Sequence, residues 1–204
     1  MEYIEKLIQR VQNTQHGFLD IQLAADEVLA AQSAAESLEL ARQLYASEIP
    51  QARSLATFLL GGLAAGSHEA LEFLKERVSL DADWRVQEIL AKAFDRFCAE
   101  RGYEQSLPVI QLWLAEPNPN LRRAVSEGLR IWTARPYFRE HPQQAIQLLS
   151  QLNSDPSEYV RKSAGNALRD ISKKHRDLVS AELQGWDLSN RHTAQTHKLA
   201  SRFL

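Results

Sequence analysis

The sequence predicts an all-α fold in which a pair of helices is repeated along the chain. Leu, Ala, Glu, Gln and Arg dominate the 204 residues, whereas only 8 Gly and 7 Pro are present, a composition that favours helices over the many turns of a β-rich fold. Apolar residues recur at helical spacing, and one sequence pattern returns several times. These three observations indicate a helical repeat solenoid, in which neighbouring repeats bury a continuous core.

The N-terminal segment, residues 1–50, is expected to form two or three amphipathic helices that cap the terminal apolar face of the solenoid. Its start, MEYIEKLIQRVQ, carries charges throughout, and no apolar run approaches the roughly 20 residues of a membrane-spanning helix. A single cysteine, Cys98, permits no internal disulfide and no cysteine-based zinc site, and we expect it to be buried. We therefore expect a soluble protein of the reducing cytoplasm.

The repeat is visible in three segments that align without gaps. They are WRVQEILAKAFDRF from Trp84, PNLRRAVSEGLRIW from Pro119 and EYVRKSAGNALRDI from Glu158, and a fainter copy, PQARSLATFLLGGL, begins at Pro50. Each copy places an apolar anchor near its start, and the four equivalent anchors are Ala52, Val86, Leu121 and Val160. The anchors are separated by 34, 35 and 39 residues, in or just below the range of two-helix repeats.

Second helices are predicted between these copies. SHEALEFLKERV begins with Ser67 as an N-cap, and YEQSLPVIQLWLAE, HPQQAIQLLSQL and the segment after Lys174 have apolar stripes of their own. Turn signals separate the helices: PNPN, RPYF and NSDPSEY. We expect ten to twelve helices in one domain over residues 1–204, with repeats over 51–185 and a C-terminal helix over 186–204. The first helices of three repeats should span 84–101, 119–134 and 157–174 and stack in one layer.

Charge is distributed unevenly along the chain. The net charge is −2, but residues 1–102 hold 10 Lys and Arg against 16 Asp and Glu, whereas residues 103–204 hold 14 against 10. The halves therefore carry −6 and +4. This difference is compatible with an anionic partner on the C-terminal half, because clustered Arg and Lys displace counterions from a phosphate backbone. An uneven charge that serves only solubility is the alternative.

A polar stripe follows from the anchors, because residues two places after a buried anchor leave the core. These residues are Glu88, Arg123 and Lys162. Residues one helical turn away share their faces, and the predicted surface residues are Trp84 and Lys92 in the first copy, Glu127 and Arg130 in the second, and Asn166, Arg169 and Lys173 in the third. The predicted result is a concave basic groove with one aromatic side chain and isolated carboxylates.

Structural roles are the alternative for several of these side chains. Trp84 could staple the preceding loop, with Asp83 as the N-cap, and Glu88 with Lys92 could form only a solvated ion pair. One residue of each basic doublet is expected to be structural, and we assign this role to Arg122 and Arg161. The remaining tryptophans are expected in the core: Trp113, Trp132 and Trp186.

The segments WRVQE, NLRRAV and YVRKSAGNALRDISKK, with IPQAR upstream, resemble the DNA alkylation repair family, the HEAT-like repeat DNA glycosylases, over roughly residues 40–185. The resemblance implies a HEAT-like solenoid that holds double-stranded, alkylated DNA on its basic groove. We expect no cofactor, no metal and no membrane partner, and we expect a monomer.

The family pattern has a Trp four residues before an Asp on one repeat helix, an Arg on the next and a further Trp on the one after. On this chain these positions fall on Trp84, Glu88, Arg123 and Asn166, so Glu stands in place of Asp and Asn in place of Trp. The implied chemistry is hydrolysis of the N-glycosidic bond of a base made cationic by alkylation, without enclosing that base in a pocket. Glu88 would stabilise the developing sugar cation, Trp84 would offer an aromatic face, and Arg123 would grip a phosphate.

The predicted DNA-binding residues are Arg123, Arg130, Lys162, Asn166, Arg169, Lys173 and Lys92. Two other functions stay open. The two departures from the family pattern are compatible with a non-catalytic relative that binds distorted or branched DNA. A helical repeat fold also serves as a protein-binding scaffold without any nucleic acid.

Overall fold

The computed structural model describes residues 2–14 and 17–204, and its regular structure is helical throughout this part of the chain. Among these residues there are thirteen α-helices, three short 3₁₀ helices and no β-strand, which confirms the all-α prediction and exceeds the ten to twelve helices expected. No helix of this part is long and apolar enough to cross a membrane. The helices group into two compact units that meet in sequence at Arg101 and Gly102.

The first unit contains six α-helices and one 3₁₀ helix among its described residues. They are α1 (Glu2–Gln12), α2 (Leu19–Ala31), α3 (Ala34–Tyr45), α4 (Pro50–Leu63), α5 (His68–Glu76), η1 (Val78–Leu80) and α6 (Trp84–Arg101). The bounds of α6 agree with the predicted helix over 84–101, and α1 to α3 agree with the two or three helices expected before residue 50.

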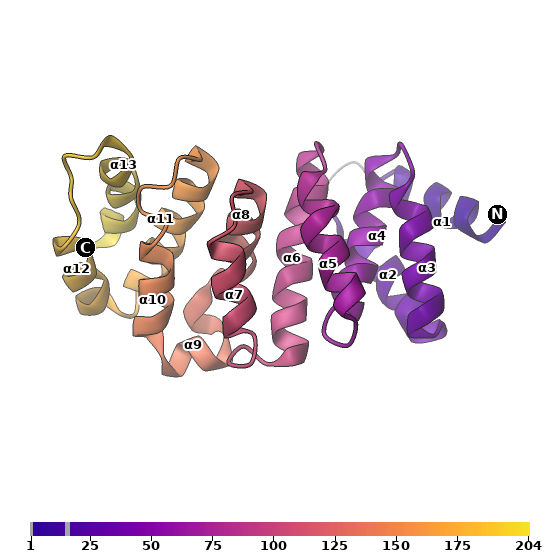
Figure 1. The fold of residues 1–204 in the computed structure, drawn as a ribbon, viewed down its shortest axis with the longest axis horizontal. Helices are drawn as coiled ribbons and strands as arrows, with labels where there is room; N and C mark the ends of the chain where they lie inside the picture. Colours follow the sequence, from indigo (N-terminus) through magenta and orange to yellow (C-terminus); the bar gives the residue numbers. More distant parts are fainter. Residues whose placement is uncertain (1, 15–16) are drawn as a thin grey trace. The chain divides into compact units, whose positions relative to one another are not determined.

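Helix α4 is the centre of the first unit, because α1, α2, α3, α5 and α6 all pack against it. Figure 1 shows these helices in indigo to magenta. Helix α4 lies close to α6 at Gly61: a Cβ atom added there would lie 2.7 Å from both the Cα and the Cβ of Ala93. The absence of a side chain at Gly61 thus sets how closely α6 lies on α4.

Polar side chains fix where three of these helices begin. Ser33 and Glu36 form a reciprocal capping box at α3, and the side chain of Ser67 accepts a hydrogen bond from the amide of Ala70 at α5, as predicted. Ahead of α6, the carboxylate of Asp83 accepts a hydrogen bond from the amide of Arg85 at 2.9 Å. The amides of the first helical turn have no partner within the helix, and this bond supplies one. It confirms Asp83 as the N-cap.

The second unit contains seven α-helices and two 3₁₀ helices. They are α7 (Leu107–Leu114), α8 (Pro119–Gly128), η2 (Trp132–Ala134), α9 (Pro136–Glu140), α10 (Pro142–Ser150), α11 (Glu158–Ser172), α12 (Arg176–Gln184), α13 (Arg191–Ala200) and η3 (Ser201–Phe203). Helix α11 agrees with the predicted 157–174 to within two residues. The helix expected over 186–204 is shorter and is followed by η3.

Helix α11 is the centre of the second unit, since α8, α10, α12 and α13 pack against it. In Figure 1 it lies beside α8, α10 and α13. A Cβ atom at Gly165 would lie 2.8 Å from the Cβ of Leu199 and 3.0 Å from the carbonyl oxygen of Thr196. The close approach of α11 and α13 therefore depends on a glycine, as that of α4 and α6 does in the first unit.

The helix predicted over 119–134 was wrong in its second half, because α8 ends at Gly128. The chain turns back there, so that the indole nitrogen of Trp132 donates a hydrogen bond to the carbonyl of Ser126 at 3.2 Å. Trp132 is fully buried, and its ring packs against Phe138 with the centroids 4.9 Å apart. Burial of this large ring under α8 stabilises the fold more than a continued helix would. A continued helix would also have placed Gly128, a poor helix former, in its interior.

The remaining core predictions hold. Trp113 and Trp186 are buried, as is Cys98. The anchors Val86, Leu121 and Val160 are each at most 2% exposed. The residues two places after these anchors are half-buried or exposed, which confirms that Glu88, Arg123 and Lys162 leave the core.

Candidate functional site

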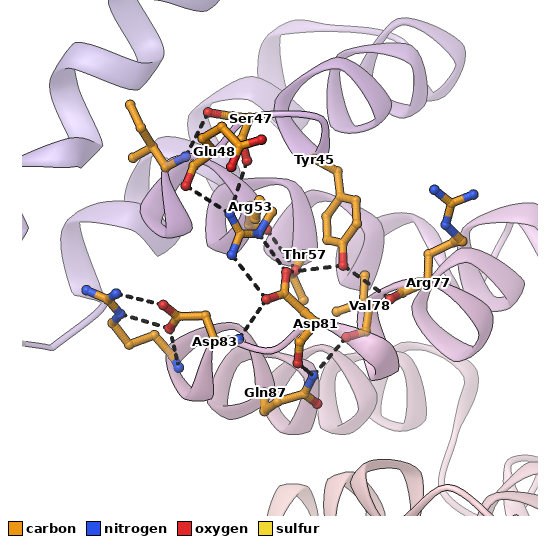
Figure 2. A network of polar contacts seen from close by, with 12 residues as sticks. Tyr45, Ser47, Glu48, Arg53, Thr57, Arg77, Val78, Asp81, Asp83 and Gln87 are labelled. Carbon is orange, nitrogen blue, oxygen red and sulfur yellow. Dashed lines mark hydrogen bonds and ion pairs between the residues drawn. The ribbon is translucent and has the colours of Figure 1, made fainter.

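A buried polar network holds the turn that leads into α6 (Figure 2). The carboxylate of Asp81 accepts two hydrogen bonds from the Arg53 guanidinium of α4, at 2.6 and 3.1 Å, and one from the Tyr45 hydroxyl of α3 at 3.2 Å. Burial, together with the nearby Asp81 carboxylate, raises the pKa of Tyr45, so the phenol stays a neutral donor. The turn is thereby tied to two other helices of its unit.

The same network continues into the first turn of α6. The side-chain amide of Gln87 donates hydrogen bonds to the carbonyls of Val78 and Asp81, at 2.9 and 2.8 Å (Figure 2). Asp83 binds the Arg85 guanidinium at 2.7 and 2.9 Å, and this hydrogen bonding lowers the pKa of Asp83. The residues on both sides of Trp84 are therefore fixed by side-chain bonds, although Trp84 itself is not part of the network.

Arg122 and Arg161 repeat this arrangement in the second unit. The Arg122 guanidinium donates to the carbonyls of Glu116 and Pro117 and binds the Asp155 carboxylate at 2.6 and 2.9 Å. Arg161 in turn donates to the carbonyls of Asp155 and Pro156 and to the side-chain oxygen of Gln195. Both arginines are buried, which confirms their structural assignment.

Trp84 and Glu88 border a cavity of about 420 Å³ in the first unit. Other walls come from Phe18, which precedes α2, from Ile21 of α2 and from Ser54 of α4. Trp84 is 71% exposed, so it does not pack over the preceding loop as the staple alternative required. An indole face, a carboxylate and the Arg85 guanidinium thus lie at the edge of one hollow.

Lys92, one helical turn beyond Glu88, makes a cation–π contact within the first unit. Its ammonium lies 4.0 Å from the centroid of the Phe18 ring. Phe18 was not identified from the sequence as a site residue, because it is far from α6 along the chain and carries no motif. The fold alone brings it to the cavity.

The polar face of α11 carries Lys162, Asn166, Arg169 and Lys173 one turn apart, as predicted. Lys162 pairs with Glu158 at 2.6 Å, and this ion pair raises the pKa of Lys162. Both side chains are more than half exposed, so the pair is a solvated one and leaves Lys162 accessible to a phosphate. Asn166, which stands where the family pattern has Trp, is half-buried.

Asp170 lies within 4 Å of three of the predicted DNA-binding residues of the second unit, Arg130, Arg169 and Lys173. Its side chain is 6% exposed and binds Arg130 at 2.7 Å and Lys173 at 3.1 Å, and Arg169 lies 3.6 Å away. Burial alone would raise the pKa of Asp170, but the hydrogen bonds from Arg130 and Lys173 outweigh it and lower the pKa. Arg130 is also bound by Glu127, so part of the predicted positive charge is neutralised within the protein.

An aromatic side chain also faces this cluster. The guanidinium of Arg169 and the ammonium of Lys173 lie 5.8 and 5.4 Å from the centroid of the Phe203 ring. Neither Asp170 nor Phe203 was identified from the sequence. Arg169 and Lys173 are therefore held in place by contacts at one end of α11.

The predicted site residues divide between the two units. Trp84, Glu88 and Lys92 share one face of α6 in the first unit, whereas Arg123 and the other cations belong to the second. No cluster of three or more His, Cys, Asp or Glu side chains that could hold a metal ion occurs within residues 2–14 and 17–204.

Two solved structures are similar to this protein over nearly its whole length. One is AlkD2 from Streptococcus mutans, which is 46% identical, with a TM-score of 0.97 and coverage of 100% of this chain and 98% of that one. Another is the alkylpurine DNA glycosylase AlkC of Pseudomonas fluorescens bound to DNA containing an abasic site analog. It is 26% identical, with a TM-score of 0.54, over 98% of this chain and 62% of that one.

Among curated proteins, the uncharacterized protein YhaZ of Bacillus subtilis is 34% identical over 105 residues. That alignment covers 50% of this chain but only 29% of YhaZ, so the similarity concerns a minor part of the longer protein. The sequence profile of the family described as DNA alkylation repair enzyme matches residues 8–202, nearly the whole chain. This protein is therefore a member of the DNA alkylation repair enzyme family.

Proposed function

We propose that this protein binds duplex DNA and acts on purines that alkylation has made cationic. The observation that carries the proposal is the pairing of Trp84 and Glu88 at the edge of one cavity on α6. Both groups attract positive charge, the indole through its π-face and the carboxylate by Coulomb attraction. A base with a fixed positive charge is the kind of DNA lesion that such a pair distinguishes from normal, neutral bases.

The reaction proposed is hydrolysis of the N-glycosidic bond. The bond between the sugar C1′ and the base nitrogen breaks, its electron pair neutralises the cationic base, and the sugar is left with the positive charge. Water then adds to C1′ and loses a proton. The Glu88 carboxylate would stabilise the sugar cation, a role in which a single well-placed group is worth about 3–4 kcal/mol.

The cations of α11 support the DNA-binding part of the proposal. Lys162 and Lys173 are exposed, and the basic side chains on this face outnumber the carboxylates that bind them. Because Asp170 and Glu127 offset part of this charge, we expect fewer phosphates to be neutralised than there are basic residues. Arg123, in the same unit, would contact a phosphate beside the lesion.

DNA binding without hydrolysis is the second candidate, and two residues favour it. Glu88 is one methylene longer than the Asp of the family pattern, and a misplacement of about 1 Å can lower a rate by on the order of 100-fold. Asn166 offers no aromatic face where the family pattern has Trp. Under this candidate the protein would recognise the lesion but release no base.

A base-release assay separates the two candidates. Wild-type protein is incubated with methylated duplex DNA, free methylpurines are measured by chromatography, and the affinity for the same duplex is measured in parallel. Release above the spontaneous rate supports hydrolysis, whereas binding without release supports the second candidate. An absence of both would contradict the proposal and favour the protein-binding scaffold.

A further inference from the structure

Helix α11 exposes only one narrow stripe of its surface. After its first residue, the side chains that are not buried are Tyr159, Lys162, Asn166 and Arg169, and every other residue of this fully described helix is buried. These four positions are three or four residues apart, so they share one face, which Lys173 continues one turn beyond Arg169. This α11 stripe, from Tyr159 to Lys173, extends about 21 Å along the helix axis, at about 1.5 Å per residue.

Aromatic rings lie at both ends of the α11 stripe. Tyr159 is 74% exposed, slightly more than Trp84. At the other end, the Phe203 ring of η3 is 45% exposed, and the Arg169 guanidinium and the Lys173 ammonium lie 5.8 and 5.4 Å from its centroid. Both rings therefore offer aromatic surface to a ligand that lies along the stripe.

The segment that carries the stripe is basic. Residues 158–174 contain five Lys and Arg against two Asp and Glu, so the segment keeps a net charge of +3. This count already includes the two carboxylates, Glu158, which pairs with Lys162, and Asp170, which pairs with Lys173. The half-buried Asn166 adds an amide that can donate and accept hydrogen bonds. Positive charge between two exposed rings suits a polyanion that also carries flat groups.

We infer that the α11 stripe binds an unpaired stretch of DNA, with phosphates at Lys162 and Lys173 and bases stacked on Tyr159 and Phe203. Proteins that hold single strands combine a cationic track with aromatic rings, because every base has a face on which a ring can stack. In a duplex these faces are covered by the neighbouring base pairs, so the rings would have no base to stack on.

The inference rests on the proposed function for the choice of DNA, and it extends that function from duplex DNA to unpaired bases. A stacked strand carries one phosphate per about 3.4 Å, so the stripe spans about six nucleotides.

Fluorescence anisotropy with a labelled oligothymidylate of about 12 nucleotides tests the inference, because this strand is longer than the stripe and does not pair with itself. The comparison ligands are the same strand paired with oligodeoxyadenylate and an equally long strand of abasic sites, which keeps the phosphates but has no bases. Tyr159→Ala should weaken binding of oligothymidylate by about 5- to 150-fold, the effect of losing one base–aromatic contact. Binding of the duplex and of the abasic strand should change by less than about twofold, because the phosphate contacts remain.

Matched variants separate stacking from a structural effect. Tyr159→Phe keeps the ring and should bind oligothymidylate as the wild type does, and Tyr3→Ala, which removes a 48% exposed tyrosine from the first unit, should change nothing. Phe203→Ala should also weaken binding of oligothymidylate. Lys162→Ala should reduce the steepness of its salt dependence by about 0.7, the value for one phosphate of a single strand. Circular dichroism verifies that each variant is folded, and if Tyr159→Ala is not, Tyr159→Leu takes its place.

The outcomes distinguish this inference from the proposed function. No binding of oligothymidylate, unchanged binding in Tyr159→Ala, or an equal loss for the single strand, the duplex and the abasic strand would overturn the inference. Methylpurine release by a protein that does not bind oligothymidylate would leave the proposed function intact and overturn the inference. Binding of oligothymidylate that depends on Tyr159, without methylpurine release, would support the inference while hydrolysis fails.

Discussion

The doublet Arg122 and Arg123 offers a test of which basic residues build the fold and which face a ligand. The side chains of Arg122 and Asp155 are 10% and 4% exposed, and Arg122→Ala would leave the Asp155 carboxylate buried without its partner. It would also remove the donor to the carbonyls of Glu116 and Pro117. Breaking a buried ion pair in this way costs about 3–5 kcal/mol of unfolding free energy.

This cost should be visible as a lower melting temperature. At about 2 °C or more per kcal/mol for a chain of this size, we expect Arg122→Ala to unfold at least about 6 °C below the wild type. Arg123→Ala, whose side chain is half-buried and not part of the core, should lower the melting temperature by less than Arg122→Ala does. Circular dichroism during heating measures both variants under the same conditions.

A double variant extends the test, because removing Asp155 together with Arg122 also removes the buried carboxylate that would otherwise lack a partner. Arg122→Ala combined with Asp155→Ala should cost less than the sum of the two single changes. Below its unfolding transition, Arg122→Ala should bind DNA as the wild type does, whereas Arg123→Ala should bind more weakly. Equal melting temperatures for the two single arginine variants would refute the division of the doublet.

Three further predictions concern binding, pH and packing. The logarithm of duplex affinity should fall linearly with the logarithm of salt concentration. Arg123→Ala and Lys162→Ala should each reduce the steepness of that line by about 0.9, because each removes one phosphate contact. An unchanged slope in both variants would mean that the DNA does not contact these two residues. The lowered pKa of Asp170 means that its ion pairs contribute stability above its unfolded pKa of about 4, and that this contribution is lost as the pH falls toward the folded value. Acid unfolding should therefore show a smaller loss of stability below about pH 4 in Asp170→Asn than in the wild type, and equal losses would contradict this. Gly61→Ala should destabilise by about 1–3 kcal/mol because its Cβ would overlap Ala93, whereas Gly66→Ala, with its nearest neighbour 4.0 Å away, should not; chemical denaturation compares the two.

The fold was predictable from the sequence wherever local pattern and packing agree. Helix α6 begins with an N-cap aspartate and carries its buried residues at helical spacing, so its bounds could be given in advance. The end of α8 could not, because the turn after Gly128 depends on the burial of Trp132 beneath the same helix. That contact is tertiary, and a helical pattern that continues to residue 134 in the sequence does not reveal it.

The candidate site was predictable only in part, for a related reason. The repeat alignment identifies Trp84, Glu88 and Lys162 as residues that leave the core, because each follows from the position of a buried anchor. Phe18 and Asp170 follow from no anchor: one reaches the cavity from another helix, and the other is a carboxylate that binds cations from two segments. Their roles depend on which side chains the fold brings together.

The central claim is that Glu88 meets the positive charge that develops in the reaction, and a single-turnover comparison of Glu88→Gln with the wild type tests it most directly. The substitution keeps the shape and hydrogen bonding of the side chain but removes its charge. Release of methylpurine from methylated duplex DNA should fall by about 100- to 1,000-fold, while affinity for the duplex holds or rises because a negative charge near phosphates is gone. Glu88→Asp, which restores the carboxylate of the family pattern, should retain or increase release. Wild-type release that is unchanged in Glu88→Gln would contradict the claim.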